Sequence, residues 1–277
     1  MQHNSQNPVK DQIDDTERFD TGLGSGLCTA ITGQKSDGKD LKVWALEFSS
    51  SLAVDEQILQ SLIRIIDQGN ISLATKIIDT LLVLNPTSIH LQFLYGTALF
   101  KDGRDVEAIN AYKTLLNQKN MNQNDKVISE IIYNTHNNLG LIFKKLGLLE
   151  DAKKTLEIAV GSHSQKAEAY NNLGTVYLEM ADISGAQKSY LRAVKLEPDD
   201  PSYYWNLHST SETVTTAKHI LGLCIKKGPR YEQGVLTLAG LEALTGNILH
   251  FNNLRDNGWE NHPLVQSIEW VLALPNI

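Results

Sequence analysis

Cysteines and long apolar runs are scarce in this sequence. Its 277 residues include two cysteines, Cys28 and Cys224, which lie far apart. They cannot form a disulfide framework, and the CxxC pairs of zinc sites are missing. No uncharged apolar stretch reaches the roughly 18 residues of a membrane-spanning helix. The polar, charged N-terminal residues do not resemble a signal peptide. We therefore expect a cytoplasmic protein with no membrane partner.

Concentrated positive charge is also missing. Lys and Arg total 25 against 32 Asp and Glu, which gives a net charge of −7 and a pI of about 5.6. Without a basic block, nucleic acid is not an expected partner. The eight histidines show no tight metal-ligand spacing, and no nucleophile stands beside a plausible base. We therefore predict no metal, no cofactor and no enzymatic activity.

The chain changes character near residue 55. Residues 1–40 are rich in Gln, Asn, Gly and Ser and are predicted to be a disordered tail. Within them, Gly33 to Asp40 has the spacing of a phosphate loop, but Asp40 replaces the Mg²⁺-binding Ser or Thr. Residues 41–54 hold a short apolar run, predicted to be a first packed segment. Beyond them, apolar residues recur at helical spacing, so the fold class is all-α.

A repeat of 34 residues decides the architecture. The segment Tyr170-Asn-Asn-Leu-Gly-Thr-Val-Tyr177 follows His136-Asn-Asn-Leu-Gly-Leu-Ile-Phe143 at this offset. A small residue in the first helix and an alanine in the second would let the two helices of a hairpin approach closely. Because one hairpin cannot bury its own apolar face, neighbouring hairpins must stack.

These signature residues resemble those of the tetratricopeptide repeat (TPR) family. The resemblance implies a right-handed superhelical solenoid of stacked antiparallel helix pairs. The array spans 55–234, with an insertion of about ten residues near 117–132. Its predicted units are 55–88, 89–122, 133–166, 167–200 and 201–230.

Irregular helices are expected over 235–277. The last of them, Leu264 to Leu274, carries one charge, so it is a candidate for self-association.

Asparagine recurs in one register of the repeats. Asn138, Asn172 and Asn206 each precede the signature leucine, or its equivalent, at steps of 34 residues. In the TPR family this register lines the concave groove, and an asparagine ladder there is similar to that of protein O-GlcNAc transferase. Each amide offers a donor and an acceptor to a peptide backbone. The other reading is that these are ordinary solvated helix residues. Further candidates for the groove are Asn137, Asn171, Trp205, Asn134, Glu168, Lys144 and Lys145.

The predicted function is a non-catalytic module that binds an extended peptide segment of a protein partner in this groove. Arrays of this family often precede a glycosyl-, sulfo- or methyltransferase domain. The alternative is therefore a substrate-recognition array whose catalytic domain is missing from this chain. A self-assembling scaffold is a further alternative. Only fragments of the family's chaperone-binding clamp can be found.

Overall fold

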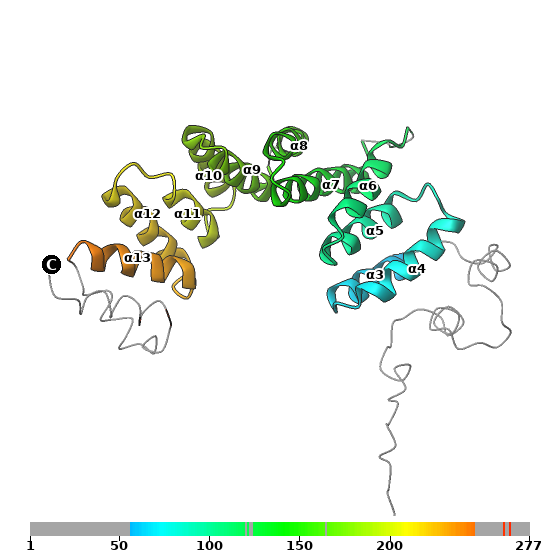
Figure 1. The fold of residues 1–277 in the computed structure, drawn as a ribbon, viewed down its shortest axis with the longest axis horizontal. Helices are drawn as coiled ribbons and strands as arrows, with labels where there is room; N and C mark the ends of the chain where they lie inside the picture. Colours follow the sequence, from blue (N-terminus) through cyan, green and yellow to red (C-terminus); the bar gives the residue numbers. More distant parts are fainter. Residues whose placement is uncertain are drawn as a thin grey trace, which may run out of the picture. The chain divides into compact units, whose positions relative to one another are not determined.

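The computed structural model describes residues 56–119, 121, 124–163 and 165–246, together with 263 and 266. This part of the chain forms eleven α-helices and no strand (Figure 1). The helices are α3 (Glu56–Asp67), α4 (Ile71–Leu84), α5 (Ile89–Lys101), α6 (Asp105–Leu116), α7 (Lys126–Lys145), α8 (Leu149–Ser162), α9 (Ala167–Glu179), α10 (Ile183–Leu196), α11 (Pro201–His208), α12 (Val214–Lys227) and α13 (Glu232–Leu244).

The chain divides into two compact units, one over residues 1–121 and one over residues 122–277. In the first unit, α5 pairs with α6 and packs on α3 and α4. In the second, the pairs are α7 with α8, α9 with α10 and α11 with α12, and α13 packs on the last pair. The predicted all-α fold of stacked helix pairs is confirmed.

Glycine brings the two helices of a pair together. A methyl group added at Gly174 of α9 would lie 2.6 Å from the ring of Tyr190 in α10. At Gly140 of α7 it would lie 2.5 Å from Leu156 of α8. Both contacts are shorter than carbon atoms allow, so only glycine fits there. The signature glycine of the repeat therefore has a steric cause.

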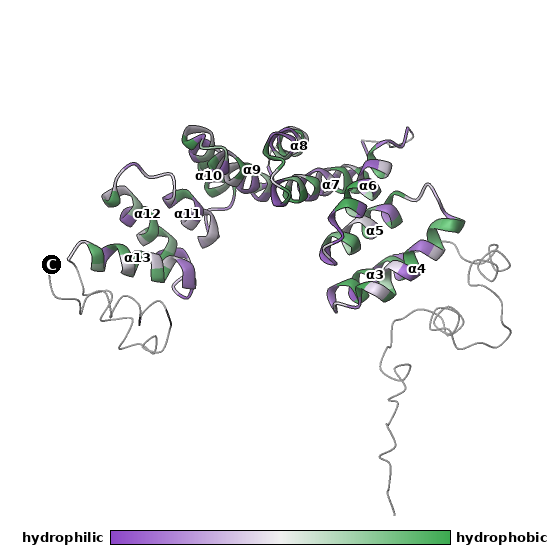
Figure 2. Cartoon of the chain, in the orientation of Figure 1, coloured by the Kyte–Doolittle hydropathy of each residue, from purple (hydrophilic) through white to green (hydrophobic). Residues whose placement is uncertain are grey.

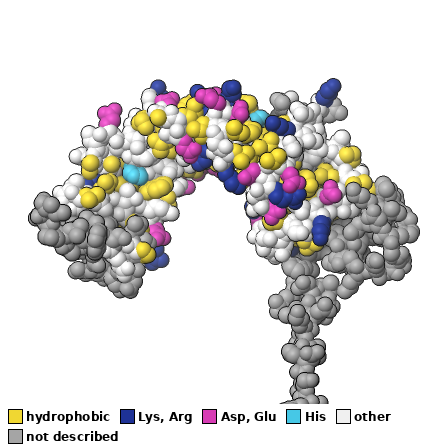
Figure 3. All heavy atoms as spheres, viewed as in Figure 1, with side chains coloured by type: hydrophobic (Ala, Val, Ile, Leu, Met, Phe, Trp, Pro, Cys, Tyr) yellow, Lys and Arg dark blue, Asp and Glu magenta, His cyan; other side chains and the backbone are white. Residues whose placement is uncertain are grey.

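Alanine has the matching role in the second helices. Ala152, Ala186 and Ala193 are fully buried. Figure 2 shows hydrophobic and hydrophilic residues alternating along the helices, as expected for amphipathic helices that bury one face. In Figure 3, charged side chains are scattered over the surface among hydrophobic ones. Each unit thus has its core between the helix pairs.

The turns inside the α7–α8 and α9–α10 pairs each contain a left-handed residue. Gly147 has this conformation between α7 and α8, with φ at 74°. In the next pair Ala181 occupies the same place with φ at 61°, and it is the one described non-glycine residue with positive φ. Left-handed backbone is unfavourable for alanine, so this turn carries local strain.

Residues near the predicted insertion extend a helix. Helix α7 begins at Lys126 and has 20 residues, whereas α9 has 13. Asp125 starts it by accepting the backbone N–H groups of Val127 and Ile128. The predicted unit boundary at 133 therefore lies inside α7.

Some expectations fall on other parts of the chain. The tail over 1–40, the segment 41–54 and the helix expected over 264–274 lie outside the described residues, apart from Gln266. Helix α13 coincides with the first of the helices expected toward the C-terminus.

Candidate functional site

The predicted asparagine register lies on consecutive first helices of the second unit. Asn137 of α7 is buried, with 2% of its surface exposed. Its oxygen accepts the side-chain N–H of Asn172 from α9 at 2.9 Å, and its own N–H donates to Glu168 at 3.0 Å. The structure therefore joins three predicted site residues in one network between α7 and α9.

The same bond recurs one repeat later. The side-chain N–H of Asn206 in α11 donates to the oxygen of Asn171 in α9 at 2.7 Å. Both residues are half-buried, as is Asn172. We call these two bonds the amide rungs, each joining an asparagine of one first helix to an asparagine of the next.

A third polar link continues the series to α13. The indole N–H of Trp205 in α11 donates to the hydroxyl of Thr237 in α13 at 3.2 Å. The Trp205 ring also lies 5.8 Å from that of His208. Helix α13 is therefore linked to α11 in the same way that α11 is linked to α9. It occupies the position of the first helix of a further pair.

Ion pairs join the first helices near their ends. Lys144 at the end of α7 lies 3.6 Å from Glu179 at the end of α9. At the other end, Lys166 lies 2.6 Å from Glu130, whose carboxylate also accepts from Asn134 at 3.5 Å. These side chains are partly exposed, so the pairs contribute little to stability. They fix the positions of the charges beside the amide rungs.

The remaining predicted residues are distributed around these links. Asn138 is half-buried on α7, and Lys145 is exposed at its end. Asn137 is too deeply buried to contact a partner, and its amide is hydrogen-bonded to Asn172 and Glu168. Sequence reasoning missed the pairing between registers. The signal was present, because two consecutive asparagines occur in both α7 and α9.

Burial and Glu168 together shape the electrostatics at the start of α9. Burial raises the pKa of the Tyr133 hydroxyl, and the Glu168 carboxylate raises it further. Burial also raises the pKa of Tyr203, with carboxylates including Glu168 adding to the effect. Burial lowers the pKa of His136, whose ring N–H donates to the carbonyl of Ile132 at 2.9 Å. The two tyrosines therefore stay neutral at physiological pH.

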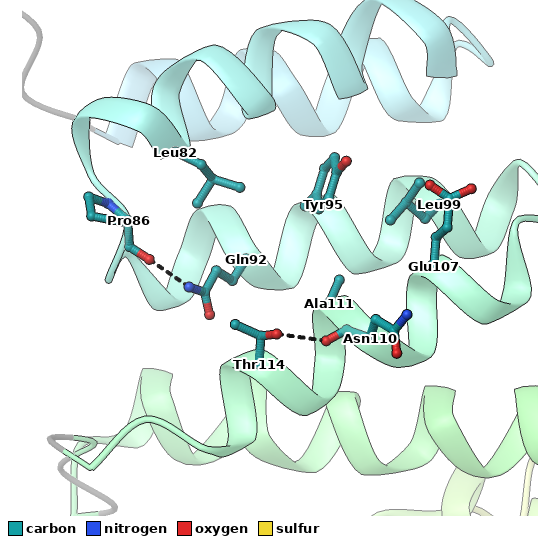
Figure 4. Close-up of a pocket in the computed structure, with 9 residues that line it drawn as sticks. All are labelled: Leu82, Pro86, Gln92, Tyr95, Leu99, Glu107, Asn110, Ala111 and Thr114. Carbon is teal, nitrogen blue, oxygen red and sulfur yellow. Dashed lines mark hydrogen bonds between the residues drawn. The ribbon is translucent and has the colours of Figure 1, made fainter.

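A separate pocket of about 430 Å³ lies in the first unit, between α4, α5 and α6 (Figure 4). Gln92 at its floor donates to the carbonyl of Pro86 at 2.6 Å and accepts from Gln118 at 2.7 Å. Burial and Asp79 raise the pKa of Tyr95, the phenol that lines it. Among the described residues that line the pocket, no nucleophile lies beside a base. It consists of Leu82, Pro86, Gln92, Tyr95, Leu99, Glu107, Asn110, Ala111 and Thr114.

Within 56–119, 121, 124–163 and 165–246, no three His, Cys, Asp or Glu side chains gather as metal ligands. None of the helices in this part of the chain is long and apolar enough to cross a bilayer. The one cysteine there, Cys224, donates to the carbonyl of Pro201, and burial raises its thiol pKa to about 11.

Stacked helix pairs closed by signature glycines and alanines define this chain as a TPR-type repeat protein. The chain belongs to the family described as the Psidin N-terminal TPR repeats region, whose model matches residues 56–220. The match covers α3 to α11 and part of α12.

One curated relative is BBSome complex member BBS4 of Xenopus tropicalis. It is 30% identical over 135 residues, which are 48% of this chain and 24% of the relative. The chain therefore spans about a quarter of that relative's length.

Solved structures agree with the fold. One is pilF of Pseudomonas aeruginosa, with a TM-score of 0.61 and 15% identity over 84% of this chain and 100% of that one. A second is the C-terminal part of a TPR repeat-containing protein from Cytophaga hutchinsonii, at 0.60 and 14% over 82% and 92%. A third is YrrB, described as a TPR protein with an unusual peptide-binding site, at 0.52 and 16% over 72% and 97%. At these identities the likeness shows the fold alone.

Proposed function

We propose that this protein is a binding module that holds an extended segment of a partner protein along α7, α9 and α11. The amide rungs carry the proposal. Asn172 and Asn206 each use one N–H to bond the preceding helix. For these two amides, the second N–H and the oxygen have no partner in the described part of the chain. An amide held in this way is preorganised to bind a peptide group.

The spacing of the helices suits an extended chain. Neighbouring packed helices lie about 8–10 Å apart, and an extended peptide rises about 3.3 Å per residue. Equivalent asparagines on adjacent helices would therefore meet every third residue of a bound segment. Asn138, Asn172 and Asn206 together would span about six residues of it.

Flanking residues would add side-chain selectivity to backbone binding. Glu168 places a negative charge beside the first rung, and at the far end of α7 Lys145 is exposed while Lys144 pairs with Glu179. Trp205 offers a rigid aromatic surface whose N–H is already bonded to Thr237. Support for a peptide ligand also comes from YrrB, the similar TPR protein described as having a peptide-binding site.

A peptide library tests this proposal. The full chain is applied to a positional-scanning library of extended peptides about ten residues long. The double variant Asn138→Ala/Asn206→Ala is compared with the matched variant Asn110→Ala, which alters an exposed asparagine of α6. Thermal unfolding followed by circular dichroism verifies that each variant is folded.

We expect the wild type and Asn110→Ala to select peptides equally well. The double variant should lose affinity by about tenfold or more, because each lost hydrogen bond weakens binding by about 0.5–1.5 kcal/mol. Equal binding by a folded double variant would refute the role of the asparagines. Failure of the wild type to bind any peptide of the library would refute peptide binding itself.

A further inference from the structure

The second helices of the second unit present a surface that the proposed peptide site does not use. Helix α10 contains three basic residues and no acidic one, and the same holds for α12. The whole chain has a net charge of −7, so this segregation of charge is local. The two helices are neighbours, since Ile220 of α12 packs against the core cluster that contains Ala186 and Tyr190 of α10.

On α10, one exposed face combines lysine and leucine. Lys188, Leu191 and Lys195 follow one another at helical spacing, and all three are exposed. Leu191 has 51% of its surface exposed. The lysines have no partner among the described residues.

The solvent-facing side of α12 repeats this pattern. Leu223 is 37% exposed and stands beside the exposed Lys226. Lys226 also has no partner in the described ranges, whereas its neighbour Lys227 pairs with Asp199 at 2.8 Å. We call Lys188, Leu191, Lys195, Leu223 and Lys226 the basic–leucine face.

Three nearby carboxylates accept hydrogen bonds elsewhere, and none of them forms an ion pair with a lysine of this face. Asp182 caps α10 by accepting the backbone N–H of Gly185 at 2.9 Å. Asp200 caps α11 by accepting the N–H of Ser202 at 2.8 Å. Glu197, which ends α10, accepts the hydroxyl of Tyr203 at 3.4 Å. Glu212 lies in the turn before α12 and is exposed. The lysines therefore remain available for acidic groups supplied from outside.

We propose that the basic–leucine face binds an acidic amphipathic helix of a partner protein. Along α10, Lys188, Leu191 and Lys195 lie on one face, so a helix packed against them would set an apolar residue on Leu191 and carboxylates on the two lysines. Residues seven apart on an α-helix lie on one face. The partner thus has apolar residues at i and i+7, flanked by Glu or Asp.

The same surface fits a lipid bilayer poorly. Helices that lie in the membrane interface combine cations with Trp, Phe and Leu. The exposed large hydrophobic side chains of the described residues are all aliphatic and include no aromatic one. In Figure 3, hydrophobic, basic and acidic side chains share the surface over the helices that Figure 1 labels α8 to α10. A mixed surface of this kind suits a protein helix with matching charge.

A designed helix tests the inference on the full chain. The probe is a fluorescent synthetic helix of about four turns, with Leu at i and i+7 and Glu beside each. Two control peptides have the same residues in scrambled order, or Lys in place of Glu. Vesicles with a fraction of anionic phosphatidylserine are tested in parallel. The protein variants are Lys188→Glu/Lys195→Glu and Leu191→Ser, with Lys154→Glu as the matched control, an exposed lysine of α8.

We expect the acidic helix to bind at least about tenfold more tightly than either control peptide. Lys188→Glu/Lys195→Glu and Leu191→Ser should each weaken it about tenfold, and Lys154→Glu should leave it unchanged. All altered side chains are wholly or partly exposed, so thermal unfolding curves should match the wild type. Equal binding of the acidic and Lys-containing helices would overturn the proposal. Binding of the vesicles without binding of the helix would overturn it too.

Discussion

Replacing Asn172 with alanine perturbs the first amide rung in a way that the structure makes quantitative. The change removes the bond from Asn172 to the oxygen of Asn137. Asn137 is 2% exposed, so water cannot replace the lost donor. Leaving a buried acceptor unsatisfied costs about 1–3 kcal/mol. Asn206→Ala breaks the equivalent bond to Asn171, which is half-buried and can bind water instead. That change should cost only about 0.5–1 kcal/mol.

Urea unfolding of the full chain, followed by circular dichroism, measures the two costs side by side. The account predicts a larger decrease in the unfolding midpoint for Asn172→Ala than for Asn206→Ala. The double variant Asn137→Ala/Asn172→Ala should cost less than the sum of its single changes, because the two residues share one bond. An equal or reversed order of the two costs would refute the reasoning from burial.

Three further changes test other parts of the structure. Gly174→Ala should destabilise the chain by about 1–3 kcal/mol, because the added methyl group forces Tyr190 to move. Gly222→Ala in α12, where the space around the glycine is open, should stabilise the chain by up to about 1 kcal/mol. If the urea midpoints of the two variants do not shift in opposite directions, this reasoning is contradicted. Ala181→Gly should raise the melting temperature, because it relieves a left-handed alanine; a decrease would show that chain entropy outweighs strain. His136 has a lowered pKa in the folded chain, so the unfolded chain binds its proton more readily, and stability should fall as pH drops below about 6.5. His136→Tyr should reduce this slope in melts recorded between about pH 7 and pH 5, and an unchanged slope would exclude His136 as a cause.

Local residue patterns were sufficient to predict the helix pairs. The small residues at Gly140 and Gly174 are signals that act over short distances, because each faces the next helix of its own hairpin. A 34-residue period then implies that the hairpins stack, since each leaves an apolar face uncovered. The start of α7 was harder to place. Asp125 is a recognisable helix N-cap, but it lies outside the repeat pattern, in the stretch where that pattern predicts an insertion.

The connections inside the candidate site depend on packing that the sequence does not specify directly. Asn137 and Asn172 occupy positions that differ by one residue within the repeat, yet their side chains are hydrogen-bonded across adjacent first helices. The burial of Asn137 also had to come from the structure, because Asn171, at the equivalent position one repeat later, is half-buried. The link from Trp205 to Thr237 needed the position of α13, where the repeat pattern is faint.

The most direct test of the central claim asks whether the asparagines recognise a peptide backbone. A peptide selected from the library is compared, by isothermal titration with the full chain, with the same peptide N-methylated at alternate backbone amides. Methylation keeps every side chain but removes the N–H groups that the oxygens of Asn172 and Asn206 would accept. The account predicts a loss of affinity of about tenfold or more. Equal affinity for the two peptides would contradict it.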